Sequence, residues 1–330
     1  MSKRSPSFEK INYSLRPGKA VERRMICYAL RKLESFGSLS EYQYIGFGST
    51  FFYDFILLHK ELGIYHLTSI EGESAKEDRF HFNKPFHCID LRIGHSNETL
   101  PEIDWSRRTV LWLDYDSKLL EDQFQDISTF FTEAQPGSVF LMTINCQGSA
   151  YGKDNEDCLL NLAASLGEDR IPLESKLSKF SGSELPKTLK EIVENEIHSI
   201  LNELNGVLAS KEKIEYIPLF YFIYRDGAKM MTIGGIVVNP ETKQFFDQAN
   251  FFELDFIYDD GTPFRIVVPN ITLKEIRFLN SQLPNGIDNN GNFVDNELVD
   301  TLKPMIPSRD ILNYKRIYKF FPVFSETFLT

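Results

Sequence analysis

The run Tyr44-Ile45-Gly46-Phe47-Gly48-Ser49-Thr50 closes a short apolar segment and leads into a pattern typical of a helix. Glycines at such a strand-to-helix turn let the backbone approach a ligand closely, and the first turn of the helix offers free N–H groups. The third glycine of a dinucleotide-binding fingerprint is missing, because position 51 is Phe, whose side chain would crowd a pyrophosphate. The run therefore predicts a ligand-binding turn and disfavours a nicotinamide dinucleotide as its ligand.

Short apolar runs alternate with helical patterns over residues 42–144. This alternation predicts βαβ units and a mainly parallel sheet. Right-handed crossovers then place the functional crevice beside the carboxyl ends of the strands. The expected strands cover 42–47, 66–70, 86–89, 109–113 and 138–144, and the expected helices cover 51–61, 75–83 and 119–133.

The second half of the chain carries one strong hairpin signal. Asp226-Gly227 separates two β-rich runs, 216–225 and 229–238, as in an antiparallel hairpin. Ahead of them, 154–212 is charged and helical in pattern, which indicates an inserted helical lobe. The predicted fold class is α/β, with a mainly parallel sheet, a terminal antiparallel hairpin, a helical insertion and a C-terminal α+β extension.

Both ends of the chain extend this core. A helix is expected between Pro17 and Gly37, and another from Thr272, with Glu275 completing a capping box. The remaining patterns after residue 240 indicate strands at 252–258 and 264–268 and a loop at 284–296. We expect a basic arm and helix at 1–41, an α/β domain at 42–240 with its insertion at about 154–212, and an extension packed on the core at 241–330.

Composition limits the classes of partner. The formal net charge of −11 argues against a general nucleic-acid coat, since phosphate binding relies on clustered Lys and Arg. No apolar run approaches the ~20 residues that a membrane span needs, and the N-terminus lacks the apolar stretch of a signal peptide. The four cysteines lie far apart, and the histidines show no metal-ligand spacing. We therefore expect a cytoplasmic protein with reduced thiols and no membrane partner.

Acidic residues follow three successive expected strands. Glu71 comes 23 residues after Gly48, and Asp90 and Asp114 end the next two strands. A carboxylate at the second strand end could accept hydrogen bonds from both hydroxyls of a ribose, although a solvated loop acid is the alternative. Because the carboxyl ends of parallel strands share one edge, we expect these three carboxylates to converge on a single ligand.

With these residues in place, the run 42–238 resembles a class I S-adenosylmethionine-dependent methyltransferase, with its Rossmann-like fold and terminal hairpin. The resemblance implies S-adenosylmethionine as cofactor. It implies that the glycine-rich turn lies along the methionine part, Glu71 binds the ribose, Asp90 lies near the adenine amino group and Asp114 lies beside the transferred methyl. The cofactor-binding residues implied are Gly46, Phe47, Gly48, Ser49, Glu71, Asp90 and Asp114.

The segment Leu113-Asp114-Tyr115-Asp116-Ser117-Lys118 resembles the Asp-rich motif of small-molecule O-methyltransferases. O-methylation is therefore the favoured reaction, with Asp114 and Asp116 orienting the acceptor and Asn145 and Lys118 assisting. An Asn-Pro-Pro-Tyr motif is absent, which disfavours methylation of adenine N6. A divalent metal is a less favoured alternative, because Ile144 stands before Asn145 where those enzymes usually show an Asp-Asn pair.

The N-terminal charge is unusual: residues 1–33 hold nine basic side chains against two acidic ones. Arg16, Lys19 and Arg23 could grip a phosphate or carboxylate of the acceptor, whether a small molecule or a nucleotide or RNA. A solvated helix face is the alternative. The incomplete first motif and the large extensions leave a second function open, a catalytically silent subunit that binds a protein partner through its extensions.

Overall fold

A mixed sheet of eight strands forms the centre of the molecule. The computed structural model describes residues 16–172, 176–258, 261–294 and 305–322. The strand order is β3-β2-β1-β4-β5-β7-β6-β8, with β1 to β5 parallel and β7 antiparallel to both of its neighbours. The strands are β1 (Gln43–Gly46), β2 (His66–Glu71), β3 (Ile89–Ile93), β4 (Thr109–Asp114), β5 (Val139–Asn145), β6 (Glu215–Asp226), β7 (Ala228–Val238) and β8 (Phe264–Ile266).

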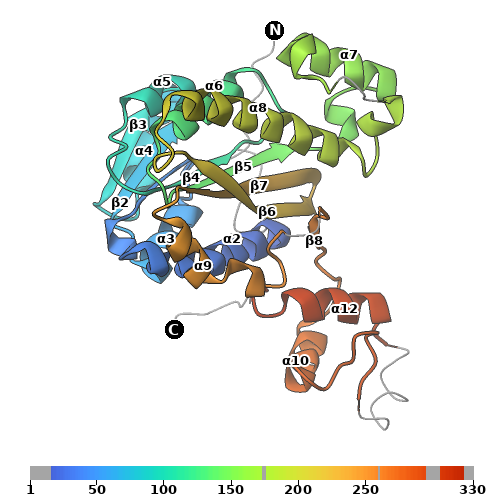
Figure 1. Ribbon diagram of the computed structural model, residues 1–330. Coiled ribbons are helices and arrows are strands. Elements are labelled where there is room, and N and C mark those ends of the chain that lie inside the picture. Colours follow the sequence, from blue (N-terminus) through green and yellow to red (C-terminus); the bar gives the residue numbers. More distant parts are fainter. Residues whose placement is uncertain (1–15, 173–175, 259–260, 295–304, 323–330) are drawn as a thin grey trace.

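Helices cover both faces of the sheet (Figure 1). On one face lie α2 (Pro17–Leu30), α3 (Tyr53–Leu62) and α9 (Lys243–Ala249); on the other lie α6 (Asp122–Glu133) and α8 (Leu185–Val207). Two apolar cores result, one under each helical layer. The other helices before β6 are α4 (Glu77–Asn83), α5 (Ser96–Thr99) and α7 (Asn155–Leu166).

The course of α2 decides where its charged residues lie. Pro17 occupies the first helical turn, where its fixed φ suits the helix and its missing N–H costs nothing. Val21, Met25 and Ile26 are fully buried against the sheet. The helix begins at the carboxyl edge and runs toward the start of β1, so its first turns lie beside the strand ends.

The predicted α/β class is confirmed, as is the hairpin, which forms β6 and β7. The predicted third strand was wrong. The apolar run 86–89 ends at Ile89, where the strand begins, and β3 is the alternating segment Ile89–Ile93. Asp90 and Arg92 lie on its exposed face, which gives the strand a period of two in place of an apolar run.

The predicted insertion divides into two parts. The helix α7 packs with the short 3₁₀ turn Leu177–Phe180, and both stand away from the sheet (Figure 1). The long helix α8 lies along the sheet and buries Ile192 and Val193 in the core of α6, a core that Leu162 of α7 and Phe180 also join. It is therefore a layer of the α/β core.

The C-terminal extension also has two parts. The helix α9 and the strand β8 join the main core, whereas the predicted strand at 252–258 is a 3₁₀ turn followed by loop. The helices α10 (Leu273–Gln282) and α12 (Ser308–Ile317) form a small core of their own below the sheet (Figure 1). The predicted helix start is confirmed, since Thr272 and Glu275 form the capping box. Within the described ranges, no helix combines the length and apolarity needed to cross a membrane.

Candidate active site

The turn after β1 is tightly specified by the protein's own packing. A Cβ on Gly48 would lie 2.5 Å from Ser69 Oγ and 2.6 Å from the Phe52 ring, and one on Gly46 would lie 2.5 Å from Tyr44 Oη. Ser49 and Phe52 take left-handed conformations, with φ of 50° and 49°. Non-glycine residues rarely adopt that conformation, and such outliers cluster at ligand sites.

Glu71 at the end of β2 is tied to this turn. Its side chain is buried, and Ser69 Oγ donates a hydrogen bond of 2.8 Å to Oε1. The same Ser69 Oγ accepts the backbone N–H of Gly48 at 3.0 Å. Burial raises the pKa of Glu71 to about 7, against the opposing effect of hydrogen bonds from Ser69 and from the backbone of Ser49 and Gly48.

A cavity of about 240 Å³ opens beside the turn, at the carboxyl ends of β1, β2 and β4. It brings together most of the residues predicted to hold a cofactor. Phe47, Gly48, Ser49, Glu71 and Asp114 line it, together with Arg23, Phe51, Tyr53, Asp54, Ile70, Gly72, Glu73, Phe80, Tyr115 and Asp116.

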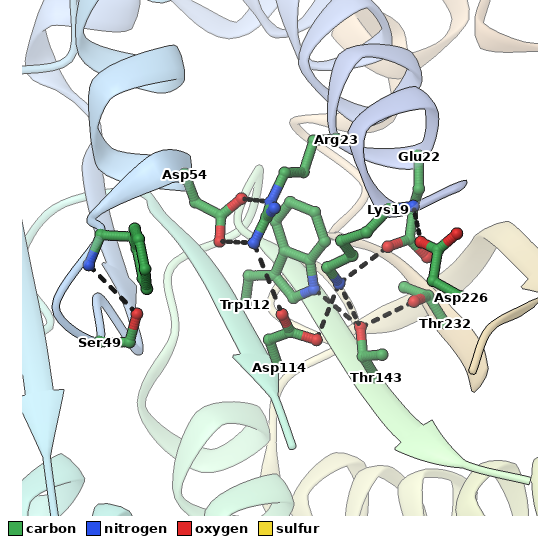
Figure 2. Close-up of polar contacts among 11 residues, drawn as sticks. Lys19, Glu22, Arg23, Ser49, Asp54, Trp112, Asp114, Thr143, Asp226 and Thr232 are labelled. Atoms are coloured by element: carbon green, nitrogen blue, oxygen red, sulfur yellow. Dashed lines mark hydrogen bonds and ion pairs between the residues drawn. The ribbon is translucent and has the colours of Figure 1, made fainter. Parts of the chain in front are cut away.

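The bases of α2 meet the acid that ends β4 (Figure 2). Lys19 Nζ lies 2.8 Å from Asp114 Oδ1 and 2.8 Å from Glu22 Oε2, and the Lys19 and Glu22 side chains are fully buried. Arg23 Nη2 lies 4.0 Å from Asp114 Oδ2, and Arg23 Nε lies 2.6 Å from Asp54 Oδ1. These bases therefore neutralise the protein's own carboxylates.

The start of α2 is held by the β6–β7 hairpin. Asp226 accepts the backbone N–H groups of Gly18 at 3.0 Å and of Lys19 at 2.8 Å. A carboxylate there satisfies two free helical N–H groups and complements the helix dipole. Thr143 Oγ1 on β5 completes the surroundings of Lys19, 3.5 Å from Nζ and 3.0 Å from Trp112 Nε1 (Figure 2).

The pKa values of the two buried acids in this cluster shift in opposite directions. Burial alone would raise the pKa of Asp114, but the Lys19 ammonium and then the Arg23 guanidinium outweigh it and hold that pKa below its ordinary value. Burial raises the pKa of Glu22 despite the attraction of Lys19. Asp114 is therefore an anion at neutral pH and a weak proton acceptor.

The structure separates the remaining predicted residues. Asp116 is exposed and lines the cavity. Asn145 lies outside it, with Oδ1 accepting the Gln147 N–H at 2.9 Å, and Lys118 lines a neighbouring hollow. Arg16, Lys19 and Arg23, which were predicted to bind an anionic group of the acceptor, are all buried, so the alternative of a solvated helix face does not hold for them.

Asp90 also lies outside the cavity. It is the second residue of β3, whereas Glu71 pairs with Ile93 at the strand's far end. Its carboxylate is half-exposed and accepts a hydrogen bond of 2.7 Å from Arg92. The expectation that it ends a strand beside the ligand was wrong, because the strand begins three residues later than predicted.

Sequence patterns missed a buried polar cluster behind the cavity. The Tyr115 hydroxyl and Ser96 Oγ both donate to Asp126 Oδ2, the latter at 2.6 Å. Burial raises the pKa of Asp126 to about 6. The Asp126 carboxyl thus links Ser96, which begins α5 after β3, with Tyr115 in the loop after β4. One signal was present: Asp126 falls on the apolar stripe of α6 with Gln123, Ile127 and Phe130.

Across the described residues, no group of three or more His, Cys, Asp or Glu is arranged to hold a metal ion. The less favoured prediction of a divalent metal at Asp114 and Asn145 therefore gains no support from their positions. Asp114 is already paired with Lys19.

Comparison with solved structures finds distant likenesses. They include Trm1 from Pyrococcus horikoshii in complex with S-adenosyl-L-methionine (10% identity, 70% of this chain, 57% of that chain, TM-score 0.43). Another is the O-methyltransferase TomG from Streptomyces achromogenes in complex with SAM (12% identity, 68% of this chain, 91% of that chain, TM-score 0.35). The chain thus spans little more than half the length of Trm1.

Sequence comparison is more decisive. None of the curated proteins matches the chain. A protein family described as "Putative O-methyltransferase" matches residues 11–329, nearly the whole chain. Because this match covers far more than half of the chain, it shows that the chain belongs to that family.

Proposed function

We propose that the protein transfers the methyl group of S-adenosylmethionine to an oxygen atom of an acceptor. The observation that supports this most is one cavity lined by the turn at Gly48, the buried Glu71 and the ionised Asp114. Glu71 suits the ribose of the cofactor, and the turn and Asp114 suit its charged amino-acid end.

The residues present fit that cofactor. The Glu71 carboxylate can accept two ribose hydroxyls, and the apolar Ile70, Phe80 and Tyr115 suit an adenine ring. At the other end, Arg23 and Asp114 present opposite charges that suit a carboxylate and an ammonium group. The cofactor would supply an electrophilic methyl group, and transfer by in-line displacement depends largely on positioning.

The chain's own residues then divide the work. The ion pairs with Lys19 and Arg23 hold the Asp114 side chain in one position and keep it ionised. Asp114 therefore positions the reactants and does not take up a proton. Asp116 at the exposed rim is the carboxylate placed to receive the proton of an oxygen acceptor. Asn145 and Lys118 remain proposed helpers on the acceptor side, since both lie beyond the cavity.

Calorimetry with S-adenosylmethionine, S-adenosylhomocysteine, NAD and ATP tests the cofactor. We expect binding of the first two, and a Glu71→Gln loss of roughly 10- to 100-fold, from loss of hydrogen bonds to a charged group. Labelled methyl transfer to a cell extract tests the reaction, and Asp116→Asn should abolish it with cofactor binding intact. Tight binding of NAD or ATP without S-adenosylmethionine would overturn the proposal.

A second function deserves the same assay, because α2 already engages Asp114. If the contact between α2 and Asp114 keeps an acceptor out of the cavity, the protein would bind S-adenosylmethionine as a scaffold subunit without transferring its methyl group. Cofactor binding with no labelled product from any extract would favour this alternative.

A further inference from the structure

Three cationic side chains lie together near the turn of the β6–β7 hairpin. Arg225 on β6 is the cross-strand partner of Lys229 on β7, and Arg265 on β8 pairs with Ile223 on β6. Paired residues, and residues two apart on one strand, share a face of the sheet. Arg225, Lys229 and Arg265 therefore project from the same face.

These three side chains line a hollow of about 460 Å³. Its wall also includes Cys146, Gln147, Gly148 and Gly182, and none of the described residues that line it carries a carboxylate. Lys229 Nζ donates to the carbonyl oxygen of Gly182 at 3.1 Å. Neither arginine forms an ion pair with any residue in the described ranges.

The nearest acid in the sequence is committed elsewhere. Asp226 follows Arg225 but accepts the N–H groups of Gly18 and Lys19 at the start of α2. Burial, with repulsion from Arg265 and Arg225, lowers the pKa of Lys229. Three cationic side chains in one hollow repel one another, and a bound anion would relieve that repulsion.

We propose that Arg225, Lys229 and Arg265 bind a phosphate group of the methyl acceptor, an inference that rests on the proposed function. Two guanidinium groups and an ammonium match the charge and the oxygen atoms of a phosphate monoester. Arg16, Lys19 and Arg23 were predicted for that role, but Lys19 and Arg23 are already paired with the protein's own carboxylates.

The position of the site sets the size of the acceptor. β7 lies two strands from β4, and Lys229 lies three residues along β7 from Thr232, which is level with Asp114 through Thr143. The usual strand spacing and rise per residue then separate Lys229 from Asp114 by roughly 14 Å. The acceptor would thus carry its phosphate roughly that far from the oxygen that receives the methyl group. Three cations are too few for the extended backbone contacts of a nucleic-acid site, so a phosphorylated small molecule is favoured.

Titration with inorganic phosphate, followed by calorimetry, tests the site directly. We expect the wild type to bind at millimolar concentration and Arg225→Gln with Arg265→Gln to weaken binding roughly tenfold per arginine, the scale of a charged hydrogen bond. Arg107→Gln is the matched control, because Arg107 lies just before β4, at the amino ends of the parallel strands and away from the hollow. It should leave phosphate binding unchanged.

Cofactor binding separates failure of this site from failure of the proposed function. All of these variants should retain wild-type affinity for S-adenosylmethionine, which also shows that they fold. Bound cofactor with equal phosphate binding in the wild type and the double variant would overturn the phosphate site alone. Absence of cofactor binding would overturn the proposed function and the acceptor role with it. Tighter binding of single-stranded RNA as its length increases, lost in the double variant, would overturn the small-molecule assignment.

Discussion

Two carboxylates at the same edge of the sheet behave in opposite ways. Glu71 ends β2 and Asp114 ends β4, and both are largely buried. Glu71 has only hydrogen-bond donors beside it and its pKa rises to about 7, whereas Asp114 has Lys19 and Arg23 and its pKa is lowered. The strand end decides where a carboxylate lies, and its partners decide its charge.

The largest effect should come from removing the shared cation. Lys19→Met removes the buried ammonium that Asp114 and Glu22 share, which should lower the free energy of unfolding by about 3–5 kcal/mol. Urea denaturation at pH 7 measures the loss. Adding Glu22→Gln to Lys19→Met should restore part of it, because a neutral amide then replaces a buried carboxyl group that has lost its partner.

An exposed pair near the end of the same helix provides the control. Arg31 lies 2.6 Å from Glu61, with both side chains 49% exposed. Arg31→Met should cost no more than about 1 kcal/mol, as is usual for surface ion pairs. Equal losses for Lys19→Met and Arg31→Met would contradict the special role given to the buried cluster.

The charge of Glu71 should have the opposite effect on stability from the charges of the Lys19 cluster. Its folded-state pKa is raised from 4.5 to about 7, so ionisation opposes folding, and stability falls as pH rises between those values. Above pH 7 the loss reaches about 3 kcal/mol, the equivalent of that shift. Glu71→Gln should therefore be more stable than the wild type at pH 8 and similar to it at pH 4. A variant that is less stable at pH 8 would show that Glu71 is not strained by burial.

The affinity for the cofactor should depend on the same ionisation of Glu71 with the opposite sign. The ionised form is less favourable for folding but should bind the cofactor more tightly. The ribose would be bound by the Glu71 carboxylate, so affinity for S-adenosylmethionine should fall about tenfold from pH 8 to pH 6. Asp114 adds nothing in this window because its pKa is lowered. Calorimetry at several pH values measures the slope, and Glu71→Gln should flatten it. A slope that persists in that variant would point to Asp126, whose pKa is about 6.

The comparison also shows which features a sequence can reveal. Alternating strands and helices predicted the sheet, and the distance from Gly48 to Glu71 placed both at one edge. Pairing across 95 residues, as between Lys19 and Asp114, leaves no periodic signal, so these bases were assigned to an anionic acceptor and their pairing with the protein's own buried acids was not predicted. Asp126 was missed for a similar reason, because its partners Tyr115 and Ser96 lie in two other segments of the chain.

Asp90 should show the smallest effect and sharpens the contrast with Glu71. Both acids were predicted to end neighbouring strands beside one ligand. Asp90 instead lies near the start of β3, half-exposed and paired with Arg92. Exposed ion pairs contribute little, so Asp90→Asn should change affinity for S-adenosylmethionine by less than about twofold and stability by less than about 1 kcal/mol. Glu71→Gln measured in parallel shows that the assay detects a ribose ligand. A loss for Asp90→Asn as large as that for Glu71→Gln would mean that β3 moves when the cofactor binds.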